Sequence, residues 1–172
     1  MDYIVLDLEW NQPVETQEES IEGLPFEIIE IGAVKLNSDF QLIDKFSQVI
    51  KPQIYQKMNY ITKKLIHLDT EELNAGRSFV EVATEFMEFC GEDYRFCTWG
   101  QLDLLELQRN MDFFHMPALC SGPLKFYDVQ KMFSIIYEDS KLRRALEYAV
   151  DYLRIEKDVA FHRAYSDAYY TA

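Results

Sequence analysis

The chain has 172 residues, the size of one domain, which is long enough to bury a core without metal or disulfide support. Hydrophobic residues make up 48% of the sequence and aromatic residues 15%, a composition that excludes a largely disordered chain. The net charge of −13 argues against a protein that binds nucleic acid over a broad surface. It is compatible with an enzyme that grips a few nucleotides and uses acidic residues to hold metal ions.

The cysteines and the hydropathy of the sequence indicate in which compartment the protein resides. Cys90, Cys97 and Cys120 cannot all pair, and no CxxC motif is present, so we interpret them as buried thiols in a reducing compartment. No run of 18 apolar residues occurs, and the N-terminus lacks a basic region followed by a cleavage site. The sequence therefore predicts a soluble cytoplasmic protein with no membrane partner.

The first part of the chain is rich in strand signals. Residues 2–10 alternate between two faces, which predicts a strand. One face carries Ile4, Leu6, Leu8 and Trp10, and the other carries Tyr3, Val5, Asp7 and Glu9. Residues 26–36 and 40–50 are further strand candidates, joined by turn residues 37–39. We expect these three strands to form an antiparallel meander.

The second part alternates helices and strands. Ser78 and Glu81 form a capping box that starts a helix ending at Gly91. The elements expected after it are a strand over 94–99, a helix over 101–114, a short strand over 124–129, a helix over 141–153 capped by Ser140, and a last helix that contains Asp167. This order predicts an α/β domain with a mixed sheet.

Asp7 and Glu9 place two carboxylates on one face of the first strand, about 6.5–7 Å apart along the backbone. Two acids that point the same way repel each other, and a cation usually compensates them. Their hard oxygen ligands suit Mg²⁺ or Mn²⁺. This spacing alone is weak evidence for a metal site, because Asp69 and Glu71 have it as well. The position of Asp7 and Glu9 on an otherwise apolar strand strengthens the metal interpretation, because buried acids need a compensating partner.

A third acid, Asp103, falls in the first turn of the helix that follows the strand end at Trp99 and Gly100. Sites in open α/β sheets form at the carboxyl ends of strands, which favours a functional role for Asp103. The alternative is that Asp103 caps the helix or complements its N-terminus.

His162 and Asp167 are five residues apart, so on one regular helix they would point about 140° away from each other. If both serve one site, His162 lies in a loop or at the helix start and Asp167 points in from the helix. Carboxylates with one histidine are the groups needed for phosphodiester cleavage by water, in which metal ions hold the phosphate and the histidine takes the water's proton. The alternative for His162, as for His67 and His115, is an ordinary surface position.

Four segments together resemble a known family. IVLDLEWNQ, FEIIEIGAVKL, TWGQLDLLEL and FHRAYSDAYYTA, in this order and spacing, resemble the three exonuclease motifs of the DEDDh 3′-5′ exonucleases, a family of the ribonuclease H-like superfamily. DLEWNQ and HRAYSDAYYTA are most similar to the branch of sporulation-inhibitor-type and histone-mRNA-trimming exonucleases. The resemblance covers nearly the whole chain and implies a ribonuclease H-like three-layer fold, in which helices flank a mixed five-stranded sheet, and a single exonuclease domain over residues 1–172. Because only five residues follow Asp167, we expect an unusually short last helix, as in a truncated domain.

The resemblance also implies a role for each site residue. Asp7, Glu9 and Asp167 would bind two Mg²⁺ or Mn²⁺ ions directly, with Asp7 bridging them, and Asp103 would hold the second ion through water. His162 would be the general base that deprotonates the attacking water. The expected reaction is hydrolysis at the 3′ end of single-stranded RNA or DNA, with release of nucleoside 5′-monophosphates.

Substrate contacts are expected from Trp10, Asn11 and Gln12, which follow the first acid pair and would meet the 3′-terminal sugar or base. The alternative for Trp10 is a core position, because it shares the strand face of Leu6 and Leu8. Two other functions are kept open: a catalytically silent nucleic-acid- or protein-binding module on the same fold, and a phosphohydrolase of small phosphoesters. Neither protein partners nor a preference for RNA or DNA follows from the sequence.

Overall fold

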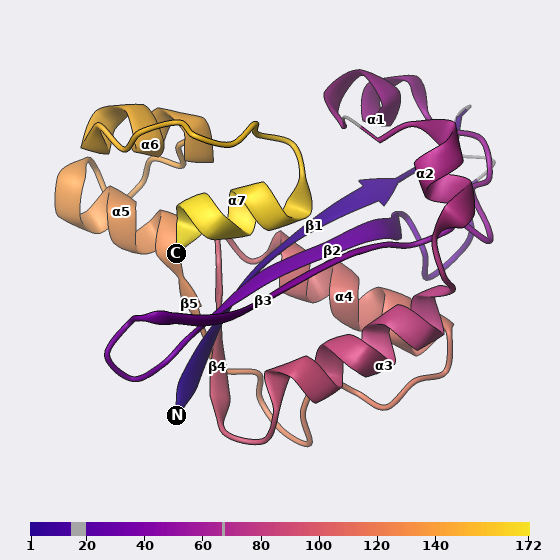
Figure 1. The fold of residues 1–172 in the computed structure, drawn as a ribbon, viewed down its shortest axis with the longest axis horizontal. Coiled ribbons are helices and arrows are strands. Elements are labelled where there is room, and N and C mark those ends of the chain that lie inside the picture. The colour runs from indigo at the N-terminus through magenta and orange to yellow at the C-terminus, as the bar shows by residue number, and fades with distance from the viewer. Residues whose placement is uncertain (15–19, 67) are drawn as a thin grey trace.

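The computed structural model describes residues 1–14, 20–66 and 68–172. Within these residues one sheet has five strands in the order β3-β2-β1-β4-β5, so β1 lies in the middle (Figure 1). The strands are β1 (Asp2–Asn11), β2 (Glu27–Leu36), β3 (Leu42–Val49), β4 (Tyr94–Thr98) and β5 (Phe126–Asp128). β1 pairs antiparallel with β2 and parallel with β4, and β3 pairs antiparallel with β2. The predicted mixed sheet and the meander of its first three strands are confirmed.

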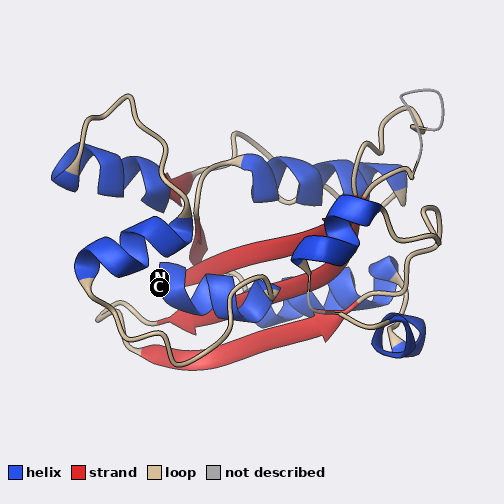
Figure 2. Cartoon of the chain, turned by 90° about the horizontal axis from the view of Figure 1, so that it is seen from above, coloured by secondary structure: helices blue, strands red, loops and turns tan. Residues whose placement is uncertain are grey.

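Helices cover both faces of this sheet (Figure 2). They are α1 (Tyr60–Leu65), α2 (Thr70–Ala75), α3 (Phe79–Cys90), α4 (Leu102–Phe113), α5 (Val129–Tyr137), α6 (Leu146–Leu153) and α7 (Ala164–Thr171). α3 and α4 pack on one face, while α7 lies across β1 and β2 on the other. The short helices α1 and α2 lie beyond the end of β1 (Figure 1). Among the described helices, none is long and apolar enough to cross a membrane.

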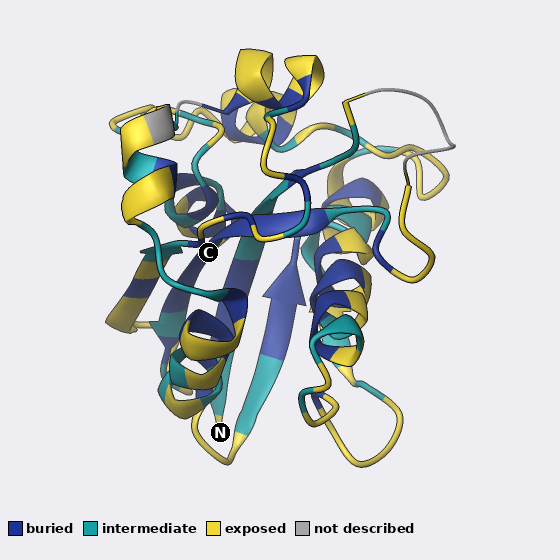
Figure 3. Ribbon diagram, turned by 90° about the vertical axis from the view of Figure 1, so that its right-hand side faces the viewer, coloured by how far each residue is buried: buried dark blue, intermediate teal, exposed yellow. Residues whose placement is uncertain are grey.

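The alternation along β1 separates two buried clusters. Ile4, Leu6 and Leu8 are buried in the larger cluster, against α3 and α4. Val5 is buried on the opposite face, where it packs with Val34 of β2. Figure 3 shows the middle of the sheet largely buried between helices whose outward sides are exposed, whereas most of the edge strand β3 is exposed. The predicted faces of the first strand are confirmed, and they leave its two acids on the α7 side.

The capping box predicted for the first long helix is present at the start of α3. The Ser78 side chain accepts a hydrogen bond from the Glu81 amide, and the Ser78 amide donates to the Glu81 carboxylate at 3.0 Å. Gly91 ends the helix with a φ of 78°, a value that favours glycine. Local sequence alone therefore sets both ends of α3.

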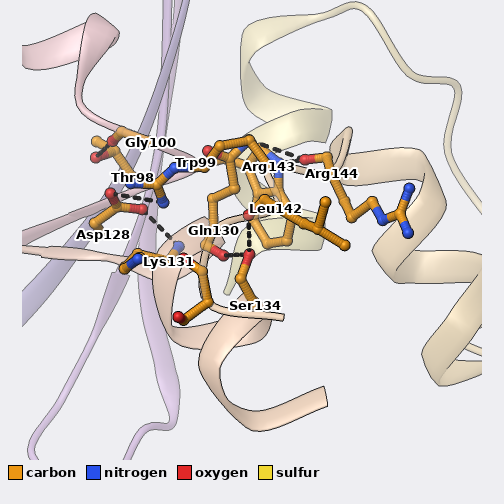
Figure 4. Close-up of polar contacts among 11 residues, drawn as sticks. Thr98, Trp99, Gly100, Asp128, Gln130, Lys131, Ser134, Leu142, Arg143 and Arg144 are labelled. Carbon is orange, nitrogen blue, oxygen red and sulfur yellow. Dashed lines mark hydrogen bonds and ion pairs between the residues drawn. The ribbon is translucent and has the colours of Figure 1, made fainter. Parts of the chain in front are cut away.

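The helix predicted over 141–153 begins at Leu146 instead, and Ser140 does not cap it. Side chains from neighbouring elements donate hydrogen bonds to backbone carbonyl groups of the segment that precedes α6, as Figure 4 shows. Ser134 Oγ donates to the Leu142 carbonyl at 2.7 Å, and Trp99 Nε1 and Gln130 Nε2 donate to the Arg144 carbonyl at 2.9 Å each. These tertiary bonds hold the segment in an irregular path, so the predicted N-terminus of this helix is wrong.

The strand predicted over 124–129 contains β5 but is shorter. Asp128 caps α5, because its carboxylate accepts a hydrogen bond from the Lys131 amide at 2.7 Å, and the strand ends there. α5 itself, like α1 and α2, was not predicted. α1 and α2 have six residues each, which is too short to display a helical apolar period.

The cysteine prediction is partly wrong. Cys90 and Cys97 are buried, as expected, but Cys120 is exposed. Cys120 lies in the loop between α4 and β5, and loops of this kind run over the protein surface.

Candidate active site

Three of the predicted metal ligands meet on the α7 side of the sheet. Asp7 and Glu9 come from β1, and Asp167 comes from the first turn of α7. Each offers a carboxylate oxygen, and these oxygens lie within 4.8 Å of one another. The group is therefore compact enough for one cation to contact all three carboxylates.

Gly32 is what lets α7 come so close to the sheet. It pairs with Asp7 across the β1–β2 ladder. A Cβ atom at Gly32 would lie 2.0 Å from both the Ala164 carbonyl carbon and the Tyr165 amide nitrogen. Any larger residue would push the start of α7 off β2, and with it Asp167.

Asp103 stands beside this group rather than within it. It lies in the first turn of α4, where its side chain is buried. Its carboxylate is near enough to Asp7 for its charge to raise the pKa of Asp7. Burial raises the pKa of Asp103 itself, and hydrogen bonds from the backbone amides of Asp103 and Leu8 offset part of this rise because they favour the ionised form. The predicted fourth acid is thus brought near the site, but it is not one of the three acids whose oxygens lie within 4.8 Å of one another.

Burial raises the pKa of all four carboxylic acids, and nearby negative charges raise it further. Burial is the larger cause in each case, and it raises the pKa of Glu9 to about 8, of Asp103 to about 7 and of Asp167 to about 6. The pKa of Asp7 is raised well above its ordinary value by burial and by the charges of Asp103, Glu9 and Asp167. Such a group of acids is unfavourable when ionised, and a bound divalent cation would offset the repulsion.

His162 lies in the loop that leads into α7, not on the helix, as the spacing argument required. It is exposed, and its backbone has a φ of 65° in the left-handed region. Its amide donates a hydrogen bond to Asp167 Oδ1 at 3.3 Å. The histidine is therefore held directly beside a predicted metal ligand.

Two further charged residues at the site were missed from the sequence. Glu30 lies opposite Glu9 in the ladder, its side chain is 1% exposed, and it forms an ion pair with Arg163. The guanidinium of Arg163 lowers the pKa of Glu9, against the effect of the surrounding acids. The position of Glu30 inside the apolar run EIIEIG could have marked it as an unusual buried acid. Nothing in the sequence predicts that Arg163 is its partner.

The three residues predicted to contact substrate differ in burial: Asn11 is buried, whereas Trp10 and Gln12 are half-buried. Asn11 is fully buried, its Nδ2 donates to the carbonyls of Tyr55 and Lys57 at 2.7 and 2.9 Å, and its Oδ1 accepts from the Asn59 amide at 2.9 Å. This bonding ties the end of β1 to the segment before α1.

Trp10 and Gln12 are half-buried, and the Trp10 ring lies 5.5 Å from the ring of Phe26. Trp10 also packs against the larger core cluster, which fits its predicted strand face.

Known proteins resemble this chain in sequence and in fold. The sequence model of the RNase T exonuclease family matches residues 4–172. The chain belongs to this family. The "Probable 3′-5′ exonuclease KapD" of Bacillus subtilis (strain 168) is 24% identical over 150 residues, which is 87% of this chain and 71% of that protein. The predicted DEDDh relationship is confirmed, and the protein is a 3′-5′ exonuclease of the RNase T family.

Solved structures agree on the fold. The nuclease domain of 3′hExo, a DEDDh family member bound to rAMP, has a TM-score of 0.80 at 18% identity, over 98% of this chain and 86% of that chain. A 3′-exonuclease that recognises the 3′ end of a histone mRNA stem-loop has a TM-score of 0.79 at 17% identity, over 98% and 77%. Escherichia coli exonuclease I in complex with dT13 has a TM-score of 0.77 at 14% identity, over 99% of this chain and 39% of that chain. The predicted ribonuclease H-like fold is confirmed.

Proposed function

We propose that this RNase T family exonuclease removes nucleotides from the 3′ end of single-stranded RNA or DNA and releases nucleoside 5′-monophosphates. The observation that carries the proposal is the compact group of Asp7, Glu9 and Asp167, with His162 bonded to its edge. The proposed active unit is one exonuclease domain over residues 1–172. Relatives support the substrate class, since one similar structure holds rAMP and another a dT13 oligonucleotide.

The donor set fits hard divalent cations. Every ligand offered is a carboxylate oxygen, and oxygen ligands favour Mg²⁺ or Mn²⁺ over softer ions. Burial, and then the charges of neighbouring acids, raise the pKa of Asp7 and Glu9, and a bound cation would offset both effects. We propose that Asp7, Glu9 and Asp167 hold two ions directly and that Asp103 supports the second through water. When bound, the ions would hold the scissile phosphate and stabilise the charge that develops on it.

The remaining chemistry belongs to the side chains. His162 would take the proton of the attacking water, because a neutral imidazole nitrogen accepts a proton and this residue is exposed next to the acids. Bond formation from the water oxygen to phosphorus would then break the bond to the 3′ oxygen of the penultimate nucleotide. The products are a nucleoside 5′-monophosphate and a strand shorter by one residue with a free 3′ hydroxyl.

Trp10 and Gln12 are the proposed contacts to the terminal sugar or base. Trp10 is half-buried at the end of β1, two residues beyond Leu8, so part of its ring is available for stacking. Stacking on one base would contribute about 1–3 kcal/mol without selecting a sequence. Asn11 would act indirectly, through the segment that it anchors. The proposed setting is the cytoplasm, which the free thiols of Cys90 and Cys97 support.

The decisive experiment uses 5′-labelled single-stranded RNA and DNA of equal sequence, incubated with Mn²⁺ and either the wild type or Asp7→Ala. The expected result is a ladder that shortens from the 3′ end with the wild type and is absent with the variant. Turnover of small phosphoesters without any ladder would replace the proposal with a phosphohydrolase. The absence of both turnover and Mn²⁺ binding would replace it with a silent binding module.

A further inference from the structure

Arg163 joins three separate elements around the proposed base. It directly follows His162, and its guanidinium reaches Glu30 on β2 and Glu72 on α2. Nε lies 3.0 and 3.1 Å from the two Glu30 oxygens, and Nη2 lies 2.9 Å from Glu30 Oε1 and 2.9 Å from Glu72 Oε1. We call Glu30, Arg163 and Glu72 the Arg163 clamp. The planar guanidinium bonds Glu30 with two donors and still reaches Glu72, whereas the ammonium of lysine is a point charge without this two-pronged geometry.

Two contacts anchor the backbone at and after the proposed base, and the clamp supplies the second of them. After His162, the Ala164 amide donates to Glu30 Oε2 at 3.2 Å, and Glu30 is itself buried. At His162, the amide donates to Asp167 Oδ1. Between these anchors His162 has a φ of 65°, a conformation that side chains with a Cβ atom avoid. Such a conformation persists only where the surrounding contacts impose it.

Stability alone does not account for the clamp. A buried ion pair contributes little net stability compared with apolar residues of the same size, so its presence is weak evidence of a stabilising role. The start of α7 is already anchored at Gly32, and Ala164 and Ala168 of α7 are fully buried. What the clamp adds is a fixed direction for the loop that carries His162.

We propose that Arg163 is a positioning residue that, through Glu30 and Glu72, holds His162 in the orientation from which it deprotonates the attacking water. The inference rests on the proposed role of His162 and deepens it, since it assigns the geometry of the base to a contact between three elements. Through Glu72, the orientation of the base is also tied to α2, which belongs to the helical segment beyond the end of β1.

The test is a double-mutant cycle on oligonucleotide hydrolysis. Arg163→Lys keeps the positive charge beside Glu9 but loses the two-pronged pair, so electrostatics at the site change little while the loop is released. We expect kcat to fall by about 10- to 100-fold with KM changed by less than about threefold. In a His162→Ala background, the same substitution should change kcat by less than about twofold, because the group that it positions is gone.

A matched control comes from a second Arg–Glu pair. Arg77, which precedes α3, makes a two-pronged ion pair with Glu85 in the middle of that helix. Arg77→Lys therefore repeats the chemical change where no predicted catalytic group is attached, and kcat should stay within about twofold of the wild type. Glu72→Gln removes only the negative charge of the outer arm of the clamp and is the second variant if Arg163→Lys does not fold. It should lower kcat by about 2- to 10-fold, again only when His162 is present.

Two results would overturn the inference: an unchanged kcat for Arg163→Lys, or an equal fractional loss of kcat in the wild-type and His162→Ala backgrounds. Hydrogen exchange of the peptide 161–168 gives a readout that does not need turnover. We expect faster exchange in Arg163→Lys than in the wild type, with α3 unchanged. If the wild type does not hydrolyse oligonucleotides, the proposed function fails, and equal exchange of this peptide in both proteins then overturns the clamp as well.

Discussion

Asp7 and Glu9 are unfavourable in their ionised forms where they stand in the fold. Both sit among other acids, and burial opposes the ionised form of each. A fold that needed only stability would place apolar residues here, as it does at Leu6 and Leu8 on the same strand. The arrangement is understandable when the carboxylates bind cations and the cations bind a phosphate.

Because the acids and the histidine have separate proposed roles, single-residue substitutions should affect metal binding and turnover differently. His162→Ala should retain Mn²⁺ binding and lose turnover by about 10²- to 10⁴-fold, since only proton transfer is removed. Asp7→Ala should lose both, because Asp7 lies at the centre of the acidic group. Calorimetric titration with Mn²⁺ and single-turnover kinetics measure the two effects. Equal Mn²⁺ affinity in the wild type and Asp7→Ala would exclude Asp7 as a ligand.

At the scale of elements, the site depends on the contact between α7 and β2. α7 brings Asp167 and the His162 loop, β1 brings the acid pair, and Gly32 of β2 sets how closely they approach. A strand and a helix terminus thus meet without an intervening side chain. This close contact requires glycine at position 32, because any side chain there would overlap the backbone of α7.

Gly32→Ala tests this contact. The added methyl group would overlap the α7 backbone at 2.0 Å, so α7 must move. We expect a loss of about 3 kcal/mol or more in the free energy of unfolding, at the upper end of overpacking effects, together with weaker Mn²⁺ binding. Gly122→Ala is the matched control, because its methyl group would meet no atom within 4 Å. A Gly32→Ala protein as stable as this control would show that α7 is not seated on β2 as described.

At the scale of the whole molecule, the acidic site couples stability to pH and to metal. The carboxyl groups of Glu9, Asp103 and Asp167 have a pKa between about 6 and about 8 when folded, against ordinary values of 4.5 for Glu and 3.8 for Asp. Between about pH 4 and pH 8 the folded protein therefore holds more protons than the unfolded chain, and the free energy of unfolding falls as pH rises.

We accordingly expect the metal-free protein to have a lower Tm at pH 8 than at pH 5. A change of about 1 kcal/mol corresponds to about 2–4 °C in a protein of this size, and the difference should be at least that large. Mn²⁺ at about 100 times its Kd should add about 2.7 kcal/mol at pH 8 and much less at pH 5, where protons compete. Asp7→Asn should raise the metal-free Tm at pH 8 and abolish the Mn²⁺ effect. A metal-free Tm that rises with pH would contradict the raised pKa values.

Much of the fold was readable from local patterns in the sequence. The alternation of residues 2–10, the capping box at Ser78 and Glu81, and the position of Gly91 each depend on neighbours in the chain, and the structure confirms them. The same patterns failed at Ser140, where side chains from the end of β4 and from α5 hold the backbone in another path. A local sequence pattern does not determine the backbone conformation where side chains from a distant element form hydrogen bonds with that backbone.

The sequence by itself determined that acids, a histidine and strand ends occur in the order of a DEDDh exonuclease, because residue types and their spacing are properties of the chain. It did not determine that three carboxylates come within 4.8 Å, that Gly32 seats α7 on β2, or that Glu30 and Glu72 share Arg163. Each of these contacts joins residues from separate elements of the fold. Only the packed tertiary structure decides them, because burial and close approach arise when distant elements exclude water together.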